Sequence, residues 1–149
     1  MQLTRAADYA VRVMVHLAGM PPATRASRAE LAVAAECPEQ FLSKVLQNLT
    51  RAGLVLSHRG NTGGFELPNI HRTATLLEVV EAIEGPIHLN ICLTSDRACT
   101  RQEWCPAHDV WVSAQQAVAD VLRNASISAL AQTAAQRRQG ELVSGPKWN

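Results

Sequence analysis

The sequence predicts an α+β protein that is mainly α-helical and carries one small β-hairpin. Three observations support this fold class. Apolar residues recur at three- and four-residue steps in several segments, as they do on one face of a helix. Two short runs of strand-forming residues flank one glycine-rich turn. The chain has 149 residues, of which 47% are hydrophobic and 18% charged, and this suffices for one packed domain with an added arm.

The first two helices are predicted from their apolar spacing and their end signals. The first has a stripe with helical spacing that consists of Leu3, Ala7, Ala10, Met14 and Leu17. Gly19 and the proline pair at 21–22 end it. Ser27 and Glu30 then have the spacing of a capping box, which predicts a second, short helix that runs to Ala35.

A third helix and a hairpin are expected next. Proline suits the first position of a helix and glycine suits the residue after its end, so this helix runs from about Pro38 to Ala52. We expect its buried stripe to consist of Phe41, Val45, Leu46 and Leu49. Two short strands, over 54–57 and 65–67, flank a glycine-rich turn. A β-hairpin directly after two helices joined by a tight turn predicts a winged helix-turn-helix.

The second half of the chain is expected to be helical on both sides of an irregular segment. One helix covers 75–84, residues 86–105 show no clear period, and a long helix runs from Pro106 to about Arg123, followed by a short helix from Ser126. We therefore divide the chain into four parts: the winged helix-turn-helix at 1–72, a linking helix and cysteine-bearing segment at 73–105, the long and short helices at 106–135, and a disordered tail at 136–149.

The basic residues are concentrated in the first half. Residues 1–72 carry eight Lys and Arg against five Asp and Glu, whereas residues 73–149 carry six against eight. The first half is therefore the part expected to bind nucleic acid. A winged helix-turn-helix places its second helix in the major groove, and a wing arginine can enter the minor groove. The candidate DNA-binding residues are Gln40, Ser43, Lys44, Gln47, Arg59 and Gly60. The alternative is a winged helix that serves only as a protein-interaction module.

Three of the four cysteines lie within fourteen residues, at Cys92, Cys99 and Cys105, and His108 follows closely. In a reducing compartment such a group indicates a metal or redox site more than disulfides. The spacing is looser than in structural zinc sites, and cysteine-rich segments in which histidine can replace one cysteine hold iron–sulfur clusters. These four residues are therefore candidate ligands of one cluster. A zinc site or a metal-free thiol switch is the alternative. Cys37 is expected to be a small core residue.

Several classes of protein are not expected. No apolar run approaches the roughly 20 residues that a membrane-spanning helix needs, and the N-terminus lacks the features of a signal peptide. We therefore expect a cytoplasmic protein without a membrane partner. There is no Cys-x-x-Cys motif, and no pairing of a nucleophile with a base stands out, so an enzyme is not expected.

Taken together, these features resemble the IscR/NsrR/RirA family of bacterial transcription regulators. The resemblance extends from Met1 to about Arg123 and is carried by residues 1–9, 49–55 and 59–65 and by the three-cysteine segment before a long helix. It implies a repressor that binds a palindromic operator in double-stranded DNA as a homodimer, held together by the long helix. It also implies a cluster that senses iron–sulfur status, nitric oxide, iron or redox state and thereby alters operator affinity.

The resemblance implies two candidates for the fourth cluster ligand. His108 matches the IscR-like position, which goes with a 2Fe–2S cluster. Asp8, supplied by the partner protomer, matches the NsrR-like position, which goes with a 4Fe–4S cluster. The sequence offers both, and we favour 2Fe–2S. The interval from Cys92 to Cys99 is one residue longer than in typical IscR-like members, so the subfamily stays open.

Overall fold

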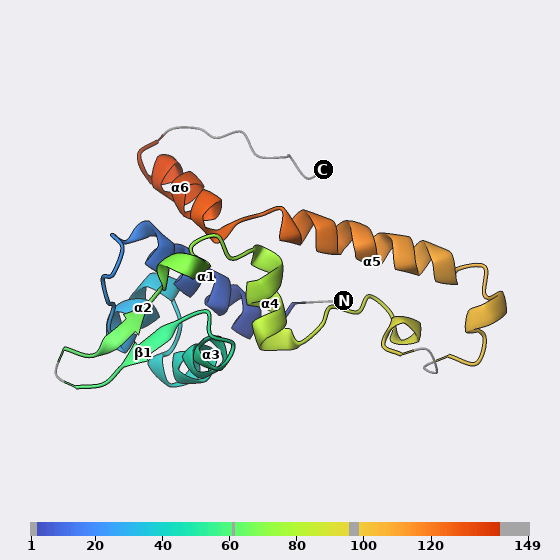
Figure 1. Ribbon diagram of the computed structural model, residues 1–149, viewed down its shortest axis with the longest axis horizontal. Helices are drawn as coiled ribbons and strands as arrows, with labels where there is room; N and C mark the ends of the chain where they lie inside the picture. Colours follow the sequence, from blue (N-terminus) through green and yellow to red (C-terminus); the bar gives the residue numbers. More distant parts are fainter. Residues whose placement is uncertain (1–2, 61, 96–98, 141–149) are drawn as a thin grey trace.

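A computed structural model describes residues 3–60, 62–95 and 99–140 (Figure 1). This part of the chain contains α1 (Arg5–Gly19), α2 (Arg28–Ala35), α3 (Glu39–Arg51), α4 (Leu76–Glu84), α5 (His108–Arg123) and α6 (Ile127–Arg138). The strands β1 (Leu56–His58) and β2 (Gly64–Glu66) form an antiparallel hairpin. Three short 3-10 turns are η1 (Asn69–His71), η2 (Ile91–Leu93) and η3 (Gln102–Trp104). The predicted fold, mainly α with one small hairpin in a winged helix-turn-helix, is confirmed.

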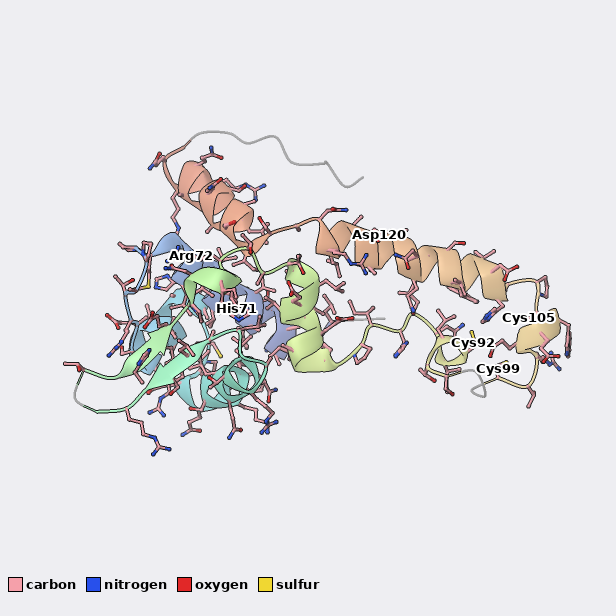
Figure 2. The ribbon with its side chains drawn as sticks, in the orientation of Figure 1. His71, Arg72, Cys92, Cys99, Cys105 and Asp120 are labelled. Carbon is pink, nitrogen blue, oxygen red and sulfur yellow. The ribbon has the colours of Figure 1, made fainter. Side chains whose placement is uncertain are left out.

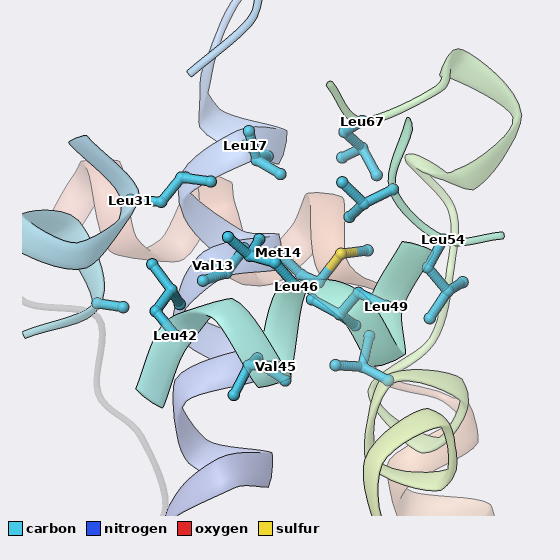
Figure 3. Close-up of a cluster of buried hydrophobic side chains, with 14 of the residues drawn as sticks. Val13, Met14, Leu17, Leu31, Leu42, Val45, Leu46, Leu49, Leu54 and Leu67 are labelled. Atoms are coloured by element: carbon cyan, nitrogen blue, oxygen red, sulfur yellow. The ribbon is translucent and has the colours of Figure 1, made fainter. Parts of the chain in front are cut away.

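Helix α1 lies at the centre of the hydrophobic core. Its buried face contacts α2, α3, α4 and α6, so that one helix organises the whole body. Figure 3 shows Val13 and Met14 of α1 among the leucines of α2 and α3. The guanidinium of Arg72 donates hydrogen bonds to the carbonyls of Ala18 (3.0 Å) and Met20 (2.9 Å), which satisfies carbonyls at the end of α1.

The helix-turn-helix is formed by α2 and α3. The predicted capping box is present, because the Ser27 hydroxyl accepts the Glu30 N–H and the Glu30 carboxylate accepts the Ser27 N–H. Glu36 turns the chain with a left-handed φ of 52°. Arg12 of α1 donates to the carbonyl of Ala35 at 3.2 Å and so fixes this turn to the central helix.

The predicted buried stripe of α3 is wrong at one position. Leu42 is fully buried with Val45, Leu46 and Leu49, whereas Phe41 is 46% exposed. The ring of Phe41 contacts Tyr9 edge-on, with centroids 5.7 Å apart. The stripe 42, 45, 46, 49 has helical spacing, and this stripe is the one that faces α1. Pro38 is the residue before the helix rather than its first residue.

The wing is tied to the helix-turn-helix by a third segment. Ser57 pairs with Phe65 in the hairpin, and Phe65 also exchanges two backbone hydrogen bonds with Ala26, at 2.8 and 2.9 Å. The backbones approach so closely that a Cβ on Gly64 would lie 2.8 Å from the Ala26 carbonyl oxygen, so glycine is required there. The predicted strand over 54–57 begins later, at Leu56, because the Leu54 N–H still donates to the Leu49 carbonyl at the end of α3 and pairing with β2 starts at Leu56.

Helix α5 extends away from this body, and α6 returns to it (Figure 1). No residue of α5 is buried in the single chain, and its exposed large apolar side chains are Val110, Trp111, Val112 and Val121. By contrast, Ile127 of α6 is fully buried, and its N–H donates to the Ala74 carbonyl at 2.8 Å. Within the described residues, no helix combines the length and apolarity needed to cross a bilayer.

Two predicted boundaries in the C-terminal half need correction. The long helix begins at His108 rather than at Pro106. The tail predicted from residue 136 is wrong over its first three residues, because α6 continues to Arg138. The reason is that α6 starts on α1 through the buried Ile127 and Ala131, and its exposed end is rich in Ala, Gln and Arg, which favour helix. Residues 141–149 of the predicted tail lie outside the described part of the chain.

Candidate nucleic-acid interface and cysteine segment

The outer face of α3 carries the polar side chains that the sequence singled out. Gln40, Lys44 and Gln47 are exposed, because the opposite stripe of the helix is held against α1. Ser43 is half-buried, and its hydroxyl donates to the Glu39 carbonyl at 3.2 Å, which leaves the oxygen free as an acceptor. The structure therefore brings these four residues together on one helix face.

The wing lies on the same side of α1 as α3 (Figure 1). Arg59 is exposed at the tip of β1, and Gly60 adopts a φ of +99° that side chains rarely tolerate. At the base of the wing, the Glu66 carboxylate lies 2.9 Å from His58 Nε2 and 3.7 Å from Arg25 Nε. The positive charge of Arg25 offsets part of the negative charge of Glu66 next to the candidate interface.

A cleft of about 610 Å³ separates α3 from the wing. Arginines from three elements line it, namely Arg28 of α2, Arg51 of α3 and Arg59 of the wing. The other polar side chains that line it are Ser43, Gln47, Thr50 and Ser57. Sequence reasoning missed Arg28 and Arg51. The excess of basic residues in the first half was the available signal, but charge counting does not assign a residue to a face.

The three clustered cysteines lie at the far end of α5 (Figure 2). Cys92 is in η2, while Cys99 and Cys105 flank η3, and each of the three is half-buried. Among the residues that the structure describes, no three His, Cys, Asp or Glu side chains are gathered closely enough to hold a metal ion. The three cysteines lie at one end of the molecule, but they do not form one coordination sphere in the described structure.

His108 stands at the boundary between the cysteine segment and α5. Its backbone N–H donates to the Cys105 carbonyl at 3.1 Å. Its ring atom Nδ1 is buried without a hydrogen-bond partner in the described structure, and so is Oε1 of Gln102. An unpartnered buried polar atom costs free energy. The three thiols and the unpartnered imidazole nitrogen of the same segment are donor types that suit iron or zinc, but the described structure does not gather them around one point.

Asp8 lies on α1, in the helical body rather than beside the cysteines. Its carboxylate is 2.9 Å from the Arg12 guanidinium, an exposed ion pair that raises the pKa of Arg12. One chain therefore does not bring Asp8 to the cysteine segment. Asp8 instead lines a largely apolar groove of about 310 Å³ with side chains of α1, α4 and α5, among them Val11, Val80 and Leu122.

Cys37 occupies a different environment from the other cysteines. It is 7% exposed in the core at the turn of the helix-turn-helix, as predicted. Burial raises the pKa of its thiol, and the charge of Arg12 offsets only part of this effect. Cys37 is therefore a packing residue and not a candidate ligand.

Comparison with known proteins gives consistent results. A family model, Rrf2, described as an iron-dependent transcriptional regulator, matches residues 3–133. The Mycobacterium tuberculosis protein Rv1287, named as an HTH-type transcriptional regulator, is 40% identical over 87 residues, which are 58% of this chain and 54% of that protein. The chain thus aligns with about half the length of that relative.

Two solved structures have the same fold. CymR (YrzC), the Global Cysteine Regulator of B. subtilis, is 25% identical, with a TM-score of 0.72 over 89% of this chain and 98% of that chain. IscR of T. potens is 22% identical, with a TM-score of 0.67 over 97% of this chain and 94% of that chain.

Proposed function

Because the chain belongs to the Rrf2 family of transcriptional regulators, we propose that it binds an operator as a homodimer whose affinity is set by an iron–sulfur cluster on Cys92, Cys99 and Cys105. The chain is a regulator and not an enzyme, in agreement with its relatives. One observation carries the proposal. Three of the four cysteines lie together at the far end of a helix that has no buried face of its own.

The operator is proposed to be read by α3 and the wing. Gln40, Lys44 and Gln47 have the length and chemistry to reach base edges in the major groove, and a bidentate contact discriminates by about 1–3 kcal/mol. Ser43 offers a free hydroxyl acceptor on the same face. Arg59 enters the adjacent minor groove, and Gly60 allows the backbone to approach a phosphate.

The homodimer is proposed to form through α5. Its exposed apolar side chains have no partner within the described chain, and the most exposed of them, Val121, is 70% exposed. A second copy that covers this helix would bury them, which is the strongest general drive for association. The groove beside Asp8 offers an apolar counterpart for such a helix. A two-fold dimer matches a palindromic operator with half-sites about 34–36 Å apart.

When bound, an iron–sulfur cluster supplies a redox-active centre that also reacts with nitric oxide and oxygen. The chain's own residues would connect the cluster to α5. The thiolates of Cys92, Cys99 and Cys105 would hold η2, η3 and the residues just before α5 against one another. Loss of the cluster would release the N-terminal end of α5. Because α5 joins the two protomers, a change there alters the separation of the two α3 helices and hence operator affinity.

The fourth ligand is proposed to be His108 or Asp8 of the partner subunit. The unpartnered Nδ1 of His108 favours the histidine, and with it a 2Fe–2S cluster. Use of Asp8 would instead require its ion pair with Arg12 to break.

The test is purification without oxygen, followed by a visible spectrum and iron and sulfide assays. We expect a coloured protein with about one cluster per chain, and loss of colour in Cys92→Ala, Cys99→Ala and Cys105→Ala. Cys37→Ala is the matched control and should keep the spectrum. Iron lost in His108→Ala but kept in Asp8→Ala would assign the histidine, and the reverse would assign the aspartate. An iron-free wild type that contains no sulfide would contradict the cluster.

The second candidate function is a thiol switch, without metal or with zinc. The likeness to a protein named the Global Cysteine Regulator and the half-buried state of three thiols favour it. In the metal-free form, a peroxide-treated protein should gain a Cys99–Cys105 disulfide with loss of two hydrogens, and a reductant should restore both the thiols and duplex binding.

A third possibility, a protein-interaction module, would show no salt-dependent duplex binding.

A further inference from the structure

The cleft between α3 and the wing has a chemical character distinct from the base-reading face of α3. Two of its three arginines stand near opposite ends of the helix. Arg28 is held at the start of α3 by Glu39, with Arg28 Nε 2.7 Å from Glu39 Oε1, whereas Arg51 is the last residue of α3. The α3 side chains that line the cleft run from Ser43 to Arg51, a stretch of roughly 12 Å. The cleft is therefore a track along the C-terminal part of α3.

Hydroxyl-bearing side chains also line this track. Thr50 and Ser57 contribute side chains from α3 and from β1. The Thr50 hydroxyl oxygen is buried, whereas Ser57 is exposed. None of the side chains found to line the cleft is acidic. A hollow lined by guanidinium groups and an exposed hydroxyl donor suits a chain of phosphate groups.

We propose that this cleft binds one strand of the DNA backbone through Arg28 and Arg51, with Ser57 as a neutral donor. The proposal rests on DNA binding by α3. A DNA strand carries one phosphate per about 3.4 Å of helix axis, so a track of this length meets several. Because phosphate contacts contain no sequence information, the cleft supplies affinity and register while the outer face of α3 supplies specificity.

Glu39 limits the strength of this contact. Its carboxylate orients the Arg28 guanidinium but also places a negative charge beside the track. Removing that charge in Glu39→Gln should therefore strengthen binding to any duplex. Removing the cation in Arg28→Gln should weaken it. The two substitutions at one ion pair thus have opposite expected signs, which general damage to the fold would not produce.

The experiment measures binding of the whole protein to two duplexes by fluorescence anisotropy over a range of salt concentrations. One duplex has random sequence, and the other is selected by the protein from a random pool. Arg51→Gln should lower affinity for both duplexes by a similar factor and reduce the salt slope by about one per protomer. Arg137→Gln, on α6 across α1 from the wing, is the control and should leave the slope unchanged.

Three outcomes would overturn the proposal. An unchanged salt slope in both Arg28→Gln and Arg51→Gln, in variants that melt like the wild type, would remove the cleft from the interface. A loss confined to the selected duplex would make these arginines base readers. Competition by inorganic phosphate beyond that of chloride at equal ionic strength, abolished by Arg51→Gln, would assign the cleft to a free anion. If the wild type itself bound no duplex, the proposed DNA-binding function would be contradicted, and this outcome differs from those that contradict the cleft alone.

Discussion

The four cysteines show how one side chain acquires different chemistry from its surroundings. Cys37 is enclosed by the core, where burial raises the pKa of its thiol. Cys92, Cys99 and Cys105 are half-buried in a segment whose described residues form no helix longer than one turn. Only a thiolate attacks an alkylating reagent, and the reagent must also reach it.

We therefore expect Cys37 to be alkylated last in the metal-free protein. Its rate with iodoacetamide at neutral pH should be at least about tenfold below that of the other three cysteines, because reaction requires local opening of the core. Mass spectrometry of time points identifies each site. Equal rates for all four in the folded protein would contradict this, and equal rates after denaturation provide the reference.

At the residue scale, the sequence predicted which residues share the exposed face of α3, but it did not predict that Arg28 and Arg51 line one cleft with Arg59. Gln40, Lys44 and Gln47 followed from helical spacing, because the apolar stripe of α3 defines its opposite face. The prediction that Phe41 rather than Leu42 is buried was wrong. It assumed that a large aromatic side chain lies in the core, whereas Phe41 packs against Tyr9 at the edge of the core. Arg28 and Arg51 reach one cleft only through the tertiary arrangement of α2, α3 and the wing.

At the scale of elements, the caps are the most predictable feature. The Ser27–Glu30 box was read directly from the sequence and is present at the start of α2. Hydrogen bonds from the backbone and then from the hydroxyl of Ser27 lower the pKa of Glu30 below its ordinary value of 4.5. This carboxylate stabilises the fold above the ordinary pKa, and the stabilisation is lost as pH falls through the folded-state pKa.

We therefore expect Glu30→Gln to flatten the acid limb of the stability curve. The glutamine still accepts the Ser27 N–H but does not titrate, so its Tm should be lower than that of the wild type above pH 5 and converge with it on acidification. Melting followed by circular dichroism from pH 7 to pH 3 measures this. Glu81→Gln, an exposed change on α4, should keep the wild-type acid limb.

The role of α6 was the least predictable among the elements. Its N-terminal half packs on α1 through Ile127 and Ala131, and its exposed C-terminal end continues as helix because Ala, Gln and Arg are strong helix formers. Ile127→Ala should lower the free energy of unfolding by about 2–5 kcal/mol, because a fully buried side chain leaves a cavity in the core of the winged helix. Ile70→Ala, at a site that is 77% exposed, should change it by less than about 0.5 kcal/mol. Urea melts compare the two, and equal effects would mean that α6 detaches in solution.

At the scale of the whole molecule, α5 has an apolar surface that a single chain leaves uncovered. We expect sedimentation to give twice the 16.2 kDa mass of the chain. Val121→Asp should weaken the dimer by roughly a hundredfold, because a carboxylate would be desolvated in the interface. Val33→Asp, at an equally exposed site on α2, should remain dimeric. A monomer at all concentrations of wild type would contradict the homodimer.

The sequence anticipates this architecture only in part. The spacing of the cysteines and the length of α5 were readable, because both are local patterns. The chain returns from α5 to the body through α6 because Ile127 is buried in the core, and no local sequence pattern reveals this burial. In the proposed cluster-loaded dimer the cysteines would converge on one centre, and this convergence is not a local pattern. Residue spacing alone therefore left two candidates for the fourth ligand.

One backbone contact has a consequence for how such proteins diversify. The Leu76 N–H donates to the Ala125 carbonyl and the Ile127 N–H to the Ala74 carbonyl, each at 2.8 Å. These two hydrogen bonds join the residues at the start of α4 to the residues at the start of α6, so the stretch between them forms a loop with paired ends. The cysteine-bearing segment within this stretch, over 88–107, can therefore change length and chemistry while the winged-helix body keeps its core. Evolution, or a protein engineer, can exchange this proposed sensor segment, which fits a single fold shared by regulators named for iron and for cysteine.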